Sequence, residues 1–279
     1  MTRLFRRAGS VTVGTILLET SFTRPTLDFS FSVTRSLKPE PNTAEIAIRN
    51  LSRASRSQLE EATVIPCEVT AGYEQQTTLI YSGTLRTAVT ERSGPTLITT
   101  IGAGDGEKKY QQSRINVPIV KGTTNSKLVQ QLIAALQIGE GNFAAVSSQL
   151  DNVAAYLPQG GVLSGSAAQI FTRVTQSLGF EWSIQGDALQ LLKVRTPIVG
   201  TAVLLRSVGT ENTGLIGTPS VNNKGVLSAR TLMIPDIFPG RLIVLESERL
   251  AGNYRCETCK YIGDTAGQDW YIDIEASRL

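Results

Sequence analysis

The stretch Leu27-Asp28-Phe29-Ser30-Phe31-Ser32-Val33-Thr34 alternates apolar and polar side chains at every step. Successive side chains of a strand point to opposite faces, so this period predicts a β-strand with one buried face. Further strands are predicted between turn residues, at 44–48, 67–71, 78–82, 84–90 and 96–101. Short strands at this spacing indicate an antiparallel barrel or sandwich, so residues 1–111 are predicted to form a β domain.

Two of these predictions concern local signals inside the first domain. Gly83 is expected to end the strand 78–82 and to separate it from the strand that begins at Thr84. Ser55 and Gln58 have the spacing of a capping box, which predicts a short helix that runs through Glu61.

The middle of the chain changes to a helical period. Asn125 is the predicted cap of a helix that stops at Gly139, and its apolar face is Leu128, Val129, Leu132, Ile133 and Leu136. A stretch rich in Gly, Gln and Ser follows and is predicted to be a loop. Ser166 then opens a second helix, and a hairpin spans 180–191, with Trp182 on its apolar face as a predicted core residue. Residues 112–197 are therefore predicted to form an α+β insert.

After Pro197 the strand pattern returns, and residues 198–279 are predicted to form a second β domain. Its strands are predicted at 226–233, 241–246, 254–262 and 269–276, after a connector at 214–219. A strand near 200–220, such as 202–206, is expected to complete the first barrel. The two β-rich outer segments are interpreted as distant copies of one β domain.

Composition excludes several classes of protein. The chain has 279 residues, enough for about two domains, with 41% hydrophobic and 18% charged residues, which excludes disorder. The formal net charge of +3 is too small to indicate nucleic-acid binding. There is no histidine, which excludes Ser-His-Asp triads, Cys-His dyads and His-ligated zinc. A non-enzymatic role is the leading expectation.

The cysteine pattern points away from metal and redox chemistry. The chain holds Cys67, Cys256 and Cys259, an odd number that does not describe a disulfide framework. Cys256 and Cys259 have C-x-x-C spacing, but strand alternation predicts that their sulfurs lie on opposite faces. Without a second pair or a histidine, we expect no metal, no cofactor and a reducing compartment.

The basic start of the chain is predicted to be a flexible, solvated arm. It carries Arg3, Arg6 and Arg7, which offer an alternative interpretation as a grip on an acidic partner or on DNA. The apolar stretch 11–18 is interrupted by Gly14 and two threonines, so it is a poor signal peptide. No run approaches the ~20 apolar residues of a membrane-spanning helix, so no membrane insertion is expected.

Two local patterns admit a chemical and a structural interpretation. Asp264, Asp269 and Asp273 lie close in sequence and suggest metal binding or glycoside cleavage, yet in a hairpin they serve the turn and the solvated strand face. The stretch 102–106, followed by Lys108-Lys109, has glycines like a phosphate loop but not the G-x-x-x-x-G-K spacing. The structural interpretation is favoured for both patterns.

Trp270 and Tyr271 are the predicted interface residues. They are neighbours in a strand and therefore point to opposite faces. One of these large aromatic side chains is expected in the core, and the other is expected to anchor a protein interface.

A set of strand-and-turn motifs runs in order along the chain. Those in the N-terminal half are 29–33, 39–46, 50–52, 71–73, 79–83 and 105–106. Those in the C-terminal half are 214–219, 231–235, 239–240, 252–255, 263–265 and 269–271. Taken in order, these motifs resemble the baseplate hub proteins of contractile-tailed bacteriophages, over nearly the full length.

The resemblance implies two tube-like antiparallel β-barrel domains flanking the helix-plus-hairpin insert. It also implies a homotrimeric ring in the virion baseplate, made in the bacterial host cytoplasm, that adapts the sixfold tail tube to the threefold central spike. Its implied partners are the spike protein, the tail tube protein, baseplate wedge components and the tape measure protein, with DNA only in passage through the channel. Two alternatives stay open: a carboxylate-based cell-wall hydrolase, and a hub or tube component of a phage-derived contractile injection system.

Overall fold

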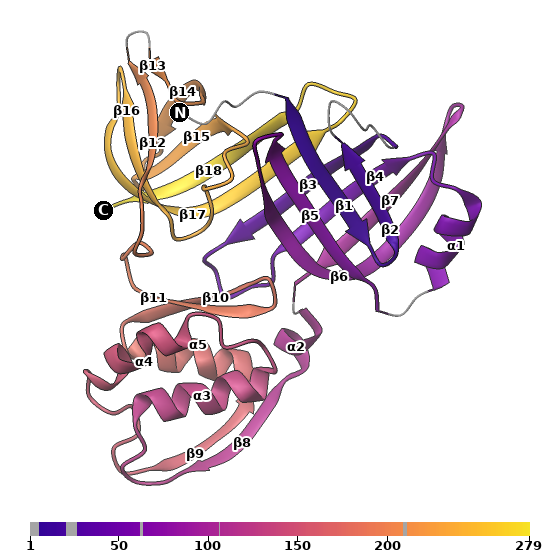
Figure 1. Cartoon of the computed structure of the whole chain (residues 1–279). Helices are drawn as coiled ribbons and strands as arrows, with labels where there is room; N and C mark the ends of the chain where they lie inside the picture. The colour runs from indigo at the N-terminus through magenta and orange to yellow at the C-terminus, as the bar shows by residue number, and fades with distance from the viewer. Residues whose placement is uncertain (1–5, 21–26, 62–63, 106, 209–210) are drawn as a thin grey trace. The chain divides into compact units, whose positions relative to one another are not determined.

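The computed structural model divides the chain into two compact units (Figure 1). A β unit comprises Met1–Ser36, Asn42–Gly104 and Pro197–Leu279, and an insert unit comprises Leu37–Pro41 and Asp105–Thr196. The insert therefore interrupts the β unit in sequence. The structure describes residues 6–20, 27–61, 64–105, 107–208 and 211–279.

Within these described residues, the β unit is one sheet of fourteen strands. Its N-terminal set is β1 (Arg7–Val13), β2 (Ile16–Thr20), β3 (Phe29–Ser36), β4 (Thr43–Arg49), β5 (Pro66–Tyr73), β6 (Gln76–Ser93) and β7 (Thr96–Gly104). Helix α1 (Arg53–Glu61) connects β4 to β5. Its C-terminal set is β12 (Val203–Val208), β13 (Glu211–Asn212), β14 (Leu215–Val221), β15 (Val226–Leu232), β16 (Leu242–Ser247), β17 (Ala251–Asp264) and β18 (Trp270–Arg278).

The two sets have the same strand topology. The N-terminal set is ordered β2-β1-β5-β6-β7-β4-β3, and the C-terminal set is ordered β13-β12-β16-β17-β18-β15-β14. Each strand of one set therefore has a counterpart at the same place in the other set, as expected for distant copies of a single β domain. One pairing differs, because β1 runs antiparallel to β5 whereas β12 runs parallel to β16.

The alternation that predicted the first strand is the alternation that builds the core. Phe29, Phe31 and Val33 of β3 are fully or almost fully buried, and the facing residues Ile46 and Ile48 of β4 are 0% exposed. The apolar faces of both sets merge into one continuous core. Burial of a large apolar side chain contributes roughly 1.5–3 kcal/mol, so this period is the main determinant of the fold.

The insert unit is a small α+β domain with its own core. Its elements are α2 (Glu107–Gln112), β8 (Arg114–Ile119), α3 (Asn125–Leu136), α4 (Phe143–Asp151), β9 (Gly161–Ser166), α5 (Ala167–Ser177), β10 (Phe180–Gln185) and β11 (Ala188–Lys193). Trp182 lies in this core as predicted, packed against Phe171. The prediction of a mainly β fold with an α+β insert is confirmed.

Buried polar side chains fix two loops of the insert. The Asn125 amide is 3% exposed, donates to the carbonyl of Leu150 at 2.9 Å and accepts the backbone N–H of Tyr156 at 2.9 Å. The Asp105 carboxylate accepts the N–H groups of Gly186 and Asp187 at 2.9 and 2.6 Å, and so holds the β10–β11 turn. These hydrogen bonds replace the ones to water that the Asn125 and Asp105 side chains lose when they are buried.

Three strand predictions are wrong. Gly83 does not break a strand but lies inside β6, where a Cβ would meet the Tyr81 hydroxyl and the Gly104 carbonyl, so glycine permits the close approach of two strands. The segment predicted as a connector at 214–219 lies mostly in β14. The strand expected to complete the first barrel near 200–220 pairs with β16 in the C-terminal set instead, because β2 already flanks β1.

The remaining corrections concern helices and the N-terminus. The predicted loop after α3 contains α4, whose small side chains gave a weak period. Thr124, not Asn125, caps α3, and Ser52 rather than Ser55 caps α1, since the Ser52 hydroxyl accepts the backbone N–H of Ser55. Arg7 lies in β1 rather than in a flexible arm, and Arg3 lies outside the described residues.

Candidate assembly interface

The N-terminal and C-terminal strand sets are joined to each other by one strand pair. β3 pairs antiparallel with β17, in a register that runs from Ser36 opposite Thr258 to Ser30 opposite Asp264. The N-terminal half of β17 pairs with β16 on the same side, so the long β17 carries two partners in succession along that side. We call this β3–β17 pair the junction.

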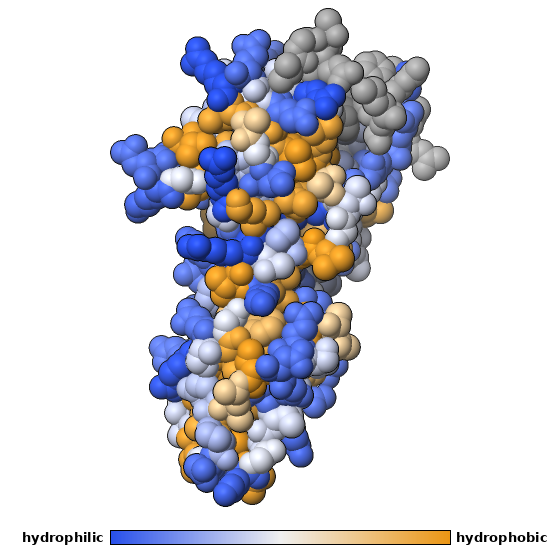
Figure 2. All heavy atoms as spheres, turned by 90° about the vertical axis from the view of Figure 1, so that its left-hand side faces the viewer, coloured by the Kyte–Doolittle hydropathy of each residue, from blue (hydrophilic) through white to orange (hydrophobic). Residues whose placement is uncertain are grey.

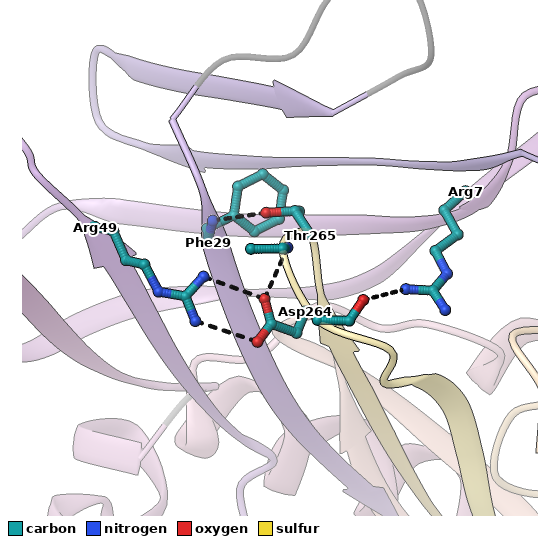
Figure 3. Close-up of polar contacts among 7 residues, drawn as sticks. Arg7, Phe29, Arg49, Asp264 and Thr265 are labelled. Atoms are coloured by element: carbon teal, nitrogen blue, oxygen red, sulfur yellow. Dashed lines mark hydrogen bonds and ion pairs between the residues drawn. The ribbon is translucent and has the colours of Figure 1, made fainter.

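The loop after β17 is fixed to the N-terminal set at the end of the junction (Figure 3). The guanidinium of Arg49 on β4 donates to both carboxylate oxygens of Asp264, at 3.3 and 3.2 Å. The backbone N–H of Ala266 donates to the same carboxylate at 2.9 Å. Partial burial alone would raise the pKa of Asp264, but these hydrogen bonds and the Arg49 charge outweigh it and lower the pKa. Asp264 is therefore an ionised clamp.

Two further contacts hold the same loop. The backbone N–H of Phe29 donates to the Thr265 hydroxyl at 2.9 Å, and the backbone N–H of Thr265 donates to the Phe29 carbonyl at 3.0 Å. Arg7 donates to the carbonyls of Gly267 and Gln268 at 2.8 and 2.6 Å. The predicted solvated Arg7 is thus a structural residue that ties β1 to the C-terminal set.

The predicted interface residues occupy the two faces of β18. Trp270 is 3% exposed, its ring meets Phe31 edge-on at 5.5 Å, and its indole N–H donates to the Gly72 carbonyl at 2.9 Å. Trp270 is therefore a core residue of this chain. Tyr271 lies on the other face, where the Arg230 guanidinium stacks 3.9 Å from the ring centroid. Its role as an interface anchor stays a prediction.

The three aspartates do not form a carboxylate pair. Asp264 is bound to Arg49, and Asp273 makes a bidentate ion pair with Arg230 at 2.7 and 3.0 Å. Asp269 is exposed in the loop between β17 and β18. Their engagement with arginines matches the structural interpretation of turn and strand face. No group of three or more potential metal-ligating side chains occurs among the described residues.

The prediction that the C-x-x-C sulfurs lie on opposite faces is wrong. A bulge between Cys256 and Thr258 inserts an extra residue into β17, and this shifts the alternation by one. Cys256 and Cys259 therefore both point into the core, 0% exposed, with their sulfurs 3.1 Å apart. Burial, followed by the hydrogen bond to Cys259, raises the pKa of Cys256 well above its usual value. Both cysteines are buried core residues, and the raised pKa of Cys256 keeps that thiol protonated.

The glycine-rich stretch 102–106 lies mostly in a strand, because β7 ends only at Gly104. The Asp105 carboxylate accepts two backbone hydrogen bonds from the β10–β11 turn. The helix that follows, α2, spans only six residues.

The outer face of the C-terminal set is polar and hollowed. A hollow of about 610 Å³ lies over β3, β14, β15, β17 and β18, and its charged lining residues are Arg230, Lys260, Asp273 and Glu275. These residues alternate with the core residues of the same strands, so one face is apolar and the other carries mixed charge. Figure 2 shows hydrophobic patches interrupted by hydrophilic residues on the side of the molecule that it displays.

Two strand edges are candidates for contact with another chain. Among the described strands, β14 pairs with β15 alone. Residues 87–93 of β6 pair with β7, whereas the opposite side loses its partner where β5 begins, at Pro66 opposite Thr84. Open backbone edges are ready sites for pairing with another chain. No helix of the described residues has the length and apolarity needed to cross a membrane.

Solved structures are similar to this chain. No family model matches it, and no curated protein sequence matches it. The 43 kDa tail protein of prophage MuSo2 from Shewanella oneidensis has a TM-score of 0.65 at 12% identity, over 98% of this chain and 98% of that chain. A tail protein from Neisseria meningitidis has a TM-score of 0.65 at 11% identity, over 98% and 96%.

A third similar structure comes from a secretion machine. An E. coli component of the type VI secretion system, described as structurally similar to bacteriophage T4 tail proteins, has a TM-score of 0.59 at 10% identity. The match covers 96% of this chain and 76% of that chain. The duplicated sheet with its α+β insert is therefore a fold that this chain shares with these two tail proteins and with the secretion component, in agreement with the fold that the sequence resemblance implied.

Proposed function

We propose that this protein is a structural baseplate hub of a phage tail, which forms a trimeric ring between the sixfold tail tube and the threefold central spike. The observation that carries the proposal is the duplication of strand order in the β unit. A trimer of a chain with two equivalent sets presents six similar sets, and so offers threefold symmetry to one partner and near-sixfold symmetry to the other.

The junction supplies a physical means of assembly. β3 and β17 show that an end strand of one set pairs with the long middle strand of the other. The same kind of contact between subunits is heterologous and closes into a ring when its rotation fits. The insert unit, which has a core of its own, is assigned to contacts with baseplate wedge components.

The fold shared with a prophage tail protein and with a second tail protein supports this role. The similarity to a type VI secretion component supports a second candidate, a hub of a phage-derived contractile injection system. Both candidates predict the same ring, and the genes that surround this one would separate them. In either role the protein acts by geometry, without a catalytic site or a cofactor.

The ring is tested by native mass spectrometry of the purified protein, alone and mixed with the spike protein from the same gene cluster. We expect a species of three chains, and a complex of three hub chains with three spike chains. A strictly monomeric protein that does not bind the spike would refute the proposal.

A further inference from the structure

The duplication also indicates which strands meet between subunits. We use two names: the β14 edge is the side of residues 216–221 that faces away from β15, and the β6 edge is the side of residues 87–93 that faces away from β7. Inside the chain, the counterpart of β14 is β3 and the counterpart of β6 is β17, and these two strands form the junction. These two edges are thus the two sides of a second junction that one chain alone cannot make.

The bulges of β6 and β17 fix the correspondence residue by residue. In β17 the pairing with β16 ends at Arg255, and a bulge follows Cys256. In β6 the pairing with β5 ends at Thr84, and a bulge follows Leu85. Because both signals coincide, the β6 edge at 87–93 corresponds to residues 258–264 of β17, the segment that pairs with β3.

A side-chain contact supports this correspondence. The Tyr261 hydroxyl donates to the carbonyl of Ile237, in the connection between β15 and β16. The corresponding residue of β6 is Thr90, whose hydroxyl contacts Glu60 in the connection between β4 and β5. The connection lies against the strand in both sets. In the C-terminal set it leaves room for β3 to pair, so we expect α1 to leave the β6 edge accessible.

β14 corresponds to β3 through its neighbours in the sheet. In the N-terminal set, the residue opposite Val33 pairs in turn with Ala103, the alanine that faces the bulge of β6. In the C-terminal set, the residue opposite Val221 pairs in turn with Ala276, which faces the bulge of β17. Val33 and Val221 therefore occupy the same place in the two sets. Val33 is 0% exposed inside the junction, whereas Val221 is 40% exposed. This exposed valine is what a missing partner strand leaves behind.

We propose that β14 of one subunit pairs antiparallel with the β6 edge of the next subunit, a second copy of this chain. Transfer of the junction register places Ser220 opposite Glu91 and Val221 opposite Thr90. An irregularity between Ile216 and Ser220 interrupts β14, so the register runs through its C-terminal end. This inference rests on the proposed ring and adds the contact that builds it.

Cysteine cross-linking tests the register. In the variant Glu91→Cys/Ser220→Cys both new thiols are on exposed positions, and opposite residues of antiparallel strands lie within the Cα distance that a disulfide needs. The three native cysteines are buried and do not compete. The matched control is Glu91→Cys/Leu17→Cys, because Leu17 is also exposed in a strand of the same sheet, on β2.

The oxidised Ser220 variant is expected to run as covalent dimers and trimers in a non-reducing gel, and the Leu17 variant as a monomer. Native mass spectrometry of both variants under reducing conditions reports the ring independently. A ring without cross-links in the Ser220 variant, or with equal cross-links in the control, overturns the proposed register and leaves the ring standing. Monomers in both measurements overturn the ring itself.

Discussion

The clamp between Arg49 and Asp264 gives the sharpest test of how the two strand sets are held together. Asp264→Asn keeps the shape of the side chain but removes its charge. The pair is bidentate, with side chains 32% and 23% exposed, so it lies between a surface pair and a buried one. A surface ion pair contributes up to about 1 kcal/mol to the free energy of unfolding, and breaking a buried pair lowers it by about 3–5 kcal/mol. We therefore expect Asp264→Asn to lower the free energy of unfolding by about 1–2 kcal/mol at neutral pH.

The pH dependence of this loss follows from the lowered pKa of Asp264. A carboxyl group whose pKa is lower in the folded than in the unfolded chain stabilises the fold above the unfolded value of about 3.9. That stabilisation disappears as the pH falls through the lower, folded value. The difference between wild type and Asp264→Asn should therefore be full at pH 7 and shrink progressively below about pH 4.

The assay is urea unfolding followed by tryptophan fluorescence. The chain has two tryptophans, one in each unit, so a Trp182→Phe background leaves Trp270 as the reporter of the β unit. Asp269→Asn is the matched control, because this exposed carboxylate lies in the same loop, and surface substitutions stay within about ±0.5 kcal/mol. An unchanged stability of Asp264→Asn at pH 7, or a loss equally large at low pH, would refute the reasoning.

Three further substitutions or labels test the core. Tyr261→Phe leaves the Ile237 carbonyl without its buried donor and should destabilise the β unit by about 1–3 kcal/mol, measured by urea unfolding. Asn125→Ala removes a buried amide that holds the segment after α4 and should lower the unfolding free energy of the insert by at least ~2 kcal/mol; an equal loss in the β unit would contradict this. Cys256 and Cys259 should resist iodoacetamide at pH 8 in the folded protein and react fully in urea, since both side chains are 0% exposed and the reagent cannot reach them; rapid labelling of folded protein would show that the site opens.

Local patterns predicted most of the strands correctly, and the failures have physical causes. The segment at 29–33 was readable because a single buried face imposes a strict period of two. The C-x-x-C sulfurs were misplaced because a one-residue bulge leaves no mark in the period before it. Helix α4 was missed because its small and polar residues bury only Phe143 and Leu150. The pattern predicted a strand break at Gly83, whereas glycine is required there because two strands approach each other closely.

The candidate interface was less accessible to sequence reasoning than the fold. Trp270 and Tyr271 stood out because aromatic side chains are common anchors, yet Trp270 fills the core of its own chain. The edges of β6 and β14 carry no distinctive side chains, since pairing between strands is made by backbone groups that every residue possesses.

The sequence by itself determined the alternating strands, the α+β insert, the absence of histidine chemistry and the resemblance to tail hub proteins. Those properties depend on which side chains are present and how they are spaced, and both are written along the chain. Only the tertiary structure decided that β3 pairs with β17, that the two sets share one strand order and that two edges match the strands of the junction. The choice of strand partner depends on twist, bulges and register across more than two hundred residues of separation, where the hydrogen-bonding groups are alike everywhere.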